Sequence, residues 1–123
     1  MLNQMMKSII EQDRAAVVIC DLDHMIIYMN PAAGEQYEKR GGISLVGKSL
    51  LDCHNERSNE IIKKVVAWFQ ESEDNNMIYT YKNEKKNMDE YMVALRDDNK
   101  KLIGYYEKHE YRDHEIMKLY DFA

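Results

Sequence analysis

The chain has 123 residues, of which 45% are hydrophobic and 32% are charged, with a single proline. This length suits one domain, and the composition is typical of an ordered globular protein rather than a disordered one. The net charge of −5 is spread along the chain without a basic block, which argues against nucleic acid and anionic lipid as partners.

The sequence also lacks signals for export or crosslinking. No apolar run reaches the ~20 residues that cross a bilayer, and the first residues are too interrupted by charge for a signal peptide. The two cysteines, Cys20 and Cys53, have neither zinc-binding nor CxxC spacing. We therefore expect a cytoplasmic chain with reduced thiols and no membrane partner.

Residues 1–13 have the pattern of an amphipathic helix, because their apolar residues recur at spacings of three and four. Such a stripe covers either the domain's own sheet or a second copy of the chain, and the pattern alone does not distinguish the two. For a homodimer, the expected contact residues are Leu2, Met5, Met6 and Ile9.

A β-hairpin is expected next, from the β-branched run at 15–22 and the strand at 25–29. Asp21 and Asp23 favour the turn between them, and no further acidic residues follow at the spacing of a metal-binding loop. Asn30 is a suitable N-cap and Pro31 suits the first helical position, so a short helix begins directly after the second strand.

A loop with one helical turn near 49–53 leads to the longest helix, for which Ser58 is the expected N-cap. Its apolar face should pack on a sheet and consists of Ile61, Ile62, Val65, Val66, Trp68 and Phe69.

Three further strands are expected at 77–82, 90–97 and 102–112, and Asp113 then begins a helical pattern. The order of elements predicts an α+β fold, in which one five-stranded antiparallel sheet is covered on one face by short helices.

The last strand carries charges on both faces, since alternation groups Glu107 and His109 with Tyr105, and Lys108 with Tyr106. Either a charged group points at the helices and needs a partner, or the end of the strand extends past the core into solvent. We favour the second interpretation.

Several segments together resemble the PAS domain family over essentially the whole chain. The segment "DLDHMIIYMNPAAGEQY" resembles the acidic turn, strand and helix start of the family. The segment "LVGKSLLD" is similar to the family's entry into the pocket helix, and "RDDNKKLIGYYE" is similar to its last hairpin. "LLDCHNERS" is also similar to a bacterial subgroup found beside hemerythrin-like modules. In this chain Lys100 replaces the glycine of the last turn, only the Asp of a terminal D-I-T is kept, and the cysteine motif of flavin photosensors is missing.

The resemblance implies a sensory domain at 14–113, preceded by the helix at 1–13 and followed at 114–123 by the start of a C-terminal helix. Such a domain binds a small ligand between sheet and helices and relays the signal through a homodimer to a fused or separate output domain. A ligandless interaction scaffold and a haem-based gas or redox sensor are the alternatives. No catalytic motif occurs, so we expect no enzyme activity.

For the ligand site, we expect residues from the loop before the long helix, from that helix and from the last three strands. The sequence does not determine a cofactor. Our first expectation is that the domain binds none, the alternative is haem with His54 as the iron ligand, and no other metal is expected. The expected ligand-binding residues are Cys53, His54, Trp68, Tyr79, Tyr81, Arg96 and Tyr106.

Overall fold

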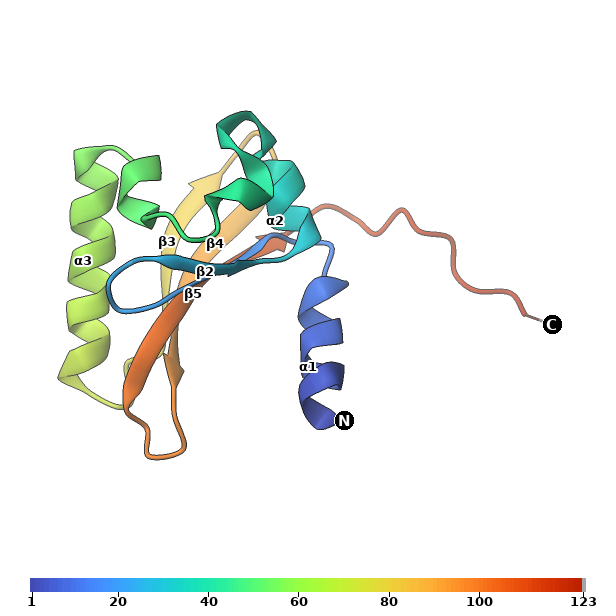
Figure 1. Ribbon diagram of the computed structural model, residues 1–123. Coiled ribbons are helices and arrows are strands. Elements are labelled where there is room, and N and C mark those ends of the chain that lie inside the picture. The colour runs from blue at the N-terminus through green and yellow to red at the C-terminus, as the bar shows by residue number, and fades with distance from the viewer. Residues whose placement is uncertain (123) are drawn as a thin grey trace.

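The computed structural model describes residues 1–122, and five antiparallel strands form its single sheet (Figure 1). The order across the sheet is β2-β1-β5-β4-β3, so the first hairpin lies beside the last strand. This confirms the predicted α+β fold. The strands are β1 (Val17–Cys20), β2 (Ile26–Met29), β3 (Met77–Asn83), β4 (Met88–Arg96) and β5 (Leu102–Tyr111).

Helices cover one face of this sheet, which we call the inner face. The long helix α3 (Glu56–Glu71) runs alongside it, and the short helix α2 (Pro31–Gln36) lies near its other end (Figure 1). Three 3-10 helices connect the two, at Glu38–Arg40, Gly42–Leu45 and Leu50–Cys53. The buried residues of α3 are Ile62, Val65, Val66 and Phe69, whereas Ile61, also expected on this face, is exposed.

The expected turn and helix start after β1 are both present. The Asp21 carboxylate accepts hydrogen bonds from the backbone N–H groups of Asp23 and Met25, which closes the turn between β1 and β2. Asn30 caps α2 by accepting from the N–H of Ala33, and Pro31 occupies the first helical position. Turn chemistry therefore accounts for the acidic pair.

Gly104 on β5 allows β1 and β5 to approach closely. A Cβ at this position would lie 2.5 Å from the backbone oxygen of Cys20, which is too short for any side chain. The glycine therefore permits the pairing that places the rest of β5 under the helices.

Two local predictions were wrong. Asn55, not Ser58, caps α3, because its side-chain oxygen accepts from the Ser58 N–H. The C-terminal helix predicted at 114–123 is not present over 114–122, and residue 123 lies outside the described residues. The apolar side chains of this tail, 114–122, are exposed, and a short helix without a packing partner is marginal in water.

The amphipathic helix is present as α1 (Leu2–Glu11), set apart from the sheet (Figure 1). No residue of α1 is buried. Among the described residues, no helix combines the length and apolar character that a membrane span requires.

Candidate functional site

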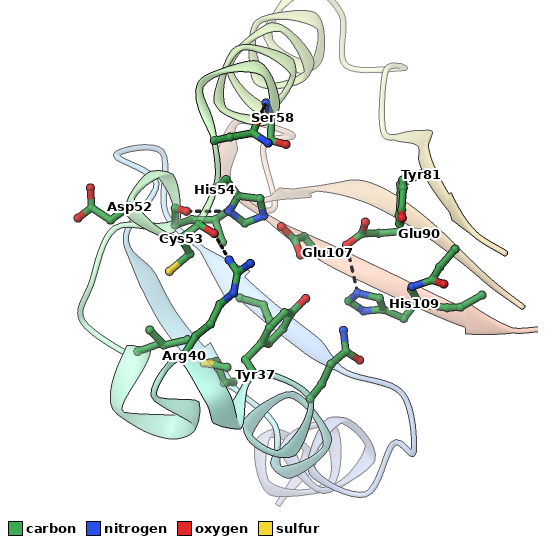
Figure 2. A pocket seen from close by; sticks show the side chains of 18 of the residues that line it. Tyr37, Arg40, Asp52, Cys53, His54, Ser58, Tyr81, Glu90, Glu107 and His109 are labelled. Carbon is green, nitrogen blue, oxygen red and sulfur yellow. Dashed lines mark hydrogen bonds and ion pairs between the residues drawn. The ribbon is translucent and has the colours of Figure 1, made fainter. Parts of the chain in front are cut away.

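A cavity of about 670 Å³ lies between the inner face of the sheet and the segment that joins α2 to α3. Its wall on the sheet side comes from β3, β4 and β5, with one residue each from β1 and β2, and its opposite wall from the 3-10 helices and the start of α3 (Figure 2). Most residues of the wall are polar or ionisable, and they include Tyr37, Arg40, Cys53, His54, Ser58, Tyr81, Glu90, Glu107 and His109.

Three titratable side chains gather on the strand wall of this cavity. Glu107 and His109 lie two residues apart on β5 and are only 5% and 4% exposed. Glu90 lies directly opposite His109 on β4, with one carboxylate oxygen 3.1 Å from the His109 Nε2. The inner face therefore continues to this point, and our preferred interpretation of a strand end in solvent was wrong.

Burial changes the protonation of these groups. Burial, together with the nearby charge of Glu90, raises the pKa of Glu107 to about 8. Burial acts in the same direction on Glu90, but its neighbour His109 outweighs it and lowers the pKa of that carboxyl. The pKa of His109 is raised, because the partners Glu90 and Ala16 outweigh burial. Burial therefore favours the neutral form of Glu107, whereas Glu90 and His109 each stabilise the charged form of the other.

His109 has a fixed orientation. Its Nδ1 lies 2.7 Å from the backbone oxygen of Ala16, and because a carbonyl only accepts, Nδ1 must carry the proton. Nε2 is therefore the nitrogen that faces the carboxyl groups. Although Nε2 is close to Glu90, the contact lacks hydrogen-bond geometry, and this buried nitrogen has no hydrogen-bond partner in residues 1–122.

His54 approaches the same groups from the opposite wall. Its Nδ1 donates to the backbone oxygen of Leu50 at 2.9 Å, and its imidazole points toward Glu107 (Figure 2). Arg40 donates to the backbone oxygen of Cys53, which ties the loop around His54 to the first 3-10 helix of the wall, Glu38–Arg40. The loop thereby holds an imidazole against a carboxyl pair.

These surroundings fit a porphyrin poorly. A haem needs apolar walls for its ring, whereas the free face of His54 points to Glu107 and Glu90. The site is chemically suited to a small polar ligand or a cation.

The structure brings together only part of the predicted ligand-binding set. Cys53, His54 and Tyr81 line the cavity. Tyr79 instead stacks on Tyr91, with ring centroids 5.3 Å apart, and donates to Asp89. A register shift in β3 between Tyr79 and Tyr81 separates these two tyrosines, which simple alternation would place on one face.

The other three predicted residues also lie outside this cavity. Arg96 donates to the backbone oxygens of Phe69, Ser72 and Asn75, so it ties the end of α3 to the sheet. Trp68, half-buried, packs against the core beside Phe69. Tyr106 points to the other side of the sheet, where it lines a smaller groove of about 300 Å³ next to α1.

Sequence reasoning missed Glu90 and Tyr37 as residues of the site. The register of the β4–β5 hairpin pairs Glu90 with His109, so the missing signal for Glu90 was this pairing rather than any motif. Tyr37 follows α2 and belongs to no segment that we connected to a ligand.

The proposed dimer residues on α1 are accessible. Leu2 is 67% and Ile9 73% exposed, and Met5 and Met6 are each 54% exposed. Most of this stripe is therefore left uncovered by the sheet, and Ile9 borders the groove that Tyr106 lines.

One buried amide connects α1 to the domain. The Nδ2 of Asn30 donates to the backbone oxygens of Ile10 and Ala15, both at 3.0 Å. Its Oδ1 accepts from the N–H groups of Val17 and Ala33, both at 2.9 Å. The end of α1, the start of β1 and the start of α2 thus meet at one side chain.

The fold resembles solved structures at low sequence identity. The C-terminal domain of a protein from Streptococcus mutans aligns with TM-score 0.71 and 19% identity, covering 88% of this chain and 83% of that one. The PAS domain of a protein from Colwellia psychrerythraea aligns with TM-score 0.67 and 14% identity, covering 91% and 98%. A VqmA–ligand–DNA complex from Vibrio cholerae aligns with TM-score 0.59 and 15% identity, covering 89% and 50%.

The sequence comparison is consistent with these structures. No curated protein sequence matched the chain. A family profile described as a PAS domain matches residues 6–109, which is most of the chain. The chain therefore belongs to the PAS domain family.

Proposed function

We propose that this PAS domain is a sensor that binds a small molecule in the cavity beside Glu107 and relays its presence to α1. The single observation that carries the proposal is the pair of buried ionisable residues, Glu107 and His109, on the wall of a 670 Å³ cavity. Buried ionisable groups cost stability, and a cavity that retains them is a common mark of a binding site.

The chemistry of the wall indicates the ligand class. The Glu90 carboxylate accepts hydrogen bonds, and the Glu107 carboxyl accepts them and, when protonated, also donates one. The apolar part of the wall consists of Val18, Met29, Leu45, Leu50 and Met88. A small molecule with amine or hydroxyl donors fits such a wall better than an apolar one. A ligandless scaffold would instead have a filled, dry core, which the cavity argues against.

The proposed relay is a chain of contacts from the cavity to α1. His109 holds the backbone of Ala16, and the flanking residues Ala15 and Val17 are both bonded to Asn30, which also holds Ile10 of α1. A ligand that moves His109 would shift the relative stability of two positions of α1. The VqmA structure combines a related fold with a ligand and DNA, which supports an output domain as the receiver here.

The ligand is tested by native mass spectrometry of the wild-type chain equilibrated with a low-molecular-mass extract of its expression host. Ser58→Trp fills the cavity from the start of α3 and is the control. We expect a bound small mass on the wild type that is absent from the variant. No bound mass on the wild type, or the same mass on both proteins, would contradict the proposal.

The dimer is tested separately. Met5→Glu and Ile9→Glu place charges in the exposed stripe of α1, and Gln4→Glu adds the same charge beside it. Sedimentation should show a wild-type dimer that the first two changes dissociate and the third leaves intact. A wild-type monomer would exclude relay through a homodimer.

A further inference from the structure

The groups on the strand wall have the composition of a metal-binding site. Glu90, Glu107 and His109 each offer one possible ligand atom, and these three atoms lie within 4.8 Å of one another. An ion at the centre of a triangle of that size would be about 2.8 Å from each corner, against about 2.0–2.2 Å for zinc ligands. Closing the site therefore needs shifts of less than about 1 Å, within the range of a side-chain adjustment.

His109 provides an independent reason to place an ion here. The hydrogen bond from Nδ1 to the Ala16 carbonyl fixes the imidazole, which is the usual arrangement around a metal-binding histidine. The other nitrogen, Nε2, is buried, lacks a hydrogen-bond partner in residues 1–122 and faces both carboxyl groups. A buried nitrogen left this way costs stability unless a proton or a cation occupies the space.

The site is accessible and has room for further ligands. All three residues line the 670 Å³ cavity, which gives an ion a path of entry. His54 points toward Glu107 from the opposite wall (Figure 2), although it is not one of the three residues whose ligand atoms lie within 4.8 Å of one another. The remaining positions would be filled by water or by the small molecule.

We propose that Glu90, Glu107 and His109 bind one divalent transition-metal ion of the Zn²⁺ class on the strand wall of the cavity. Imidazole nitrogen together with carboxylate oxygen favours zinc, manganese or iron over calcium and magnesium, and no thiolate is in the set to favour copper(I) or an iron–sulfur cluster. This inference goes beyond the proposed function, because the ion needs neither the small molecule nor the relay to α1.

The test is isothermal titration of the chelator-stripped full chain with Zn²⁺, and with Ca²⁺ as the comparison ion. We expect one Zn²⁺ per chain and a raised melting temperature, since an ion that binds only the folded state stabilises it. Co²⁺ should give visible absorption bands that report nitrogen and oxygen ligands. Failure of the wild type to bind Zn²⁺, Mn²⁺ and Co²⁺, or equal affinity for Ca²⁺, would overturn the proposal.

Matched variants locate the ion. Glu107→Gln keeps the shape of a protonated carboxyl and should fold, and we expect it to weaken Zn²⁺ binding at least about tenfold, as should His109→Gln. Glu110→Gln lies beside these residues on β5 but away from the cavity, and His114→Ala is in the exposed tail. These two should bind as the wild type does. Loss of binding in His114→Ala with full binding in Glu107→Gln would show a surface ion instead.

Discussion

The Nδ1 of His109 donates to the backbone carbonyl of Ala16 at 2.7 Å, which joins the strand wall of the cavity to the first residues of the domain. Ala16 lies between Ala15 and Val17, and both of these are held by the side chain of Asn30. One polar route therefore runs from a candidate ligand site on β5 to α1.

Removing the amide of Asn30 should release α1. Asn30→Ala deletes the cap of α2 and leaves the buried N–H of Val17 without its acceptor, so we expect a loss of roughly 2–4 kcal/mol in the free energy of unfolding. Asn30→Ser keeps a capping oxygen but is too short to reach Ile10. Urea unfolding should place Asn30→Ser between the wild type and Asn30→Ala, and equal stability of all three proteins would contradict this role.

Glu107 should make stability depend on pH. Its pKa is raised from 4.5 in the unfolded chain to about 8 in the folded one, so the folded state holds the proton more tightly. The resulting stabilisation is complete below about pH 4.5 and is lost as the pH rises through about 8. Glu107→Gln cannot ionise, and it should therefore gain stability relative to the wild type as the pH rises from about 5 to about 9.

This comparison is made by urea unfolding in the presence of a chelator, so that metal does not contribute. His109, Glu90, His54 and Tyr37 surround the carboxyl and stay unchanged. Glu110→Gln, whose carboxyl lies outside the cavity, is the control and should follow the wild type. Parallel pH profiles for the wild type and Glu107→Gln would show that Glu107 ionises freely.

Lys100 should be a site for stabilisation. It has φ of 65° in the last hairpin turn, at the position where the family resemblance led us to expect glycine. A left-handed conformation costs a side chain about 1 kcal/mol, so Lys100→Gly should raise the free energy of unfolding by about 0.5–1 kcal/mol. The neighbouring Lys101→Gly, where no positive φ is relieved, should lower it. A destabilised Lys100→Gly protein would show that the strain is absent.

Arg96 should stabilise the fold without affecting the ligand. Its guanidinium donates to three backbone oxygens at the end of α3 and to the side chain of Asn76. Arg96→Gln should therefore lose about 1–3 kcal/mol of unfolding free energy while retaining any mass bound in the cavity. If Arg96→Gln lost the bound mass while its stability stayed unchanged, Arg96 would belong to the ligand site after all.

Local signals in the sequence were sufficient for most of the fold. The cap at Asn30, the turn at Asp21 and the strand patterns depend on neighbouring residues, and the structure contains each of them. The candidate site depends on distant pairings. Glu90 enters it only because β4 and β5 pair in one register, and Tyr79 leaves it only because β3 shifts register before Tyr81.

The prediction that the end of β5 extends past the core into solvent was wrong because the core reaches further along this strand. Alternation correctly grouped Glu107 with His109, yet burial of both depends on how far the helices cover β5, which no local pattern encodes. The tail was also expected to be helical, but its apolar side chains are exposed, and its ion pair from Glu115 to Arg14 lies at the surface.

The proposed relay requires that the cavity and α1 are coupled. Hydrogen exchange of the α1 amides is the most direct test, comparing the wild type with Ser58→Trp, whose side chain occupies the cavity, and with Arg57→Trp, an exposed neighbour. We predict that exchange in α1 changes at least about threefold in Ser58→Trp and stays at the wild-type rate in Arg57→Trp. Identical exchange in all three proteins would show that filling the cavity leaves α1 unchanged, and it would contradict the proposed coupling.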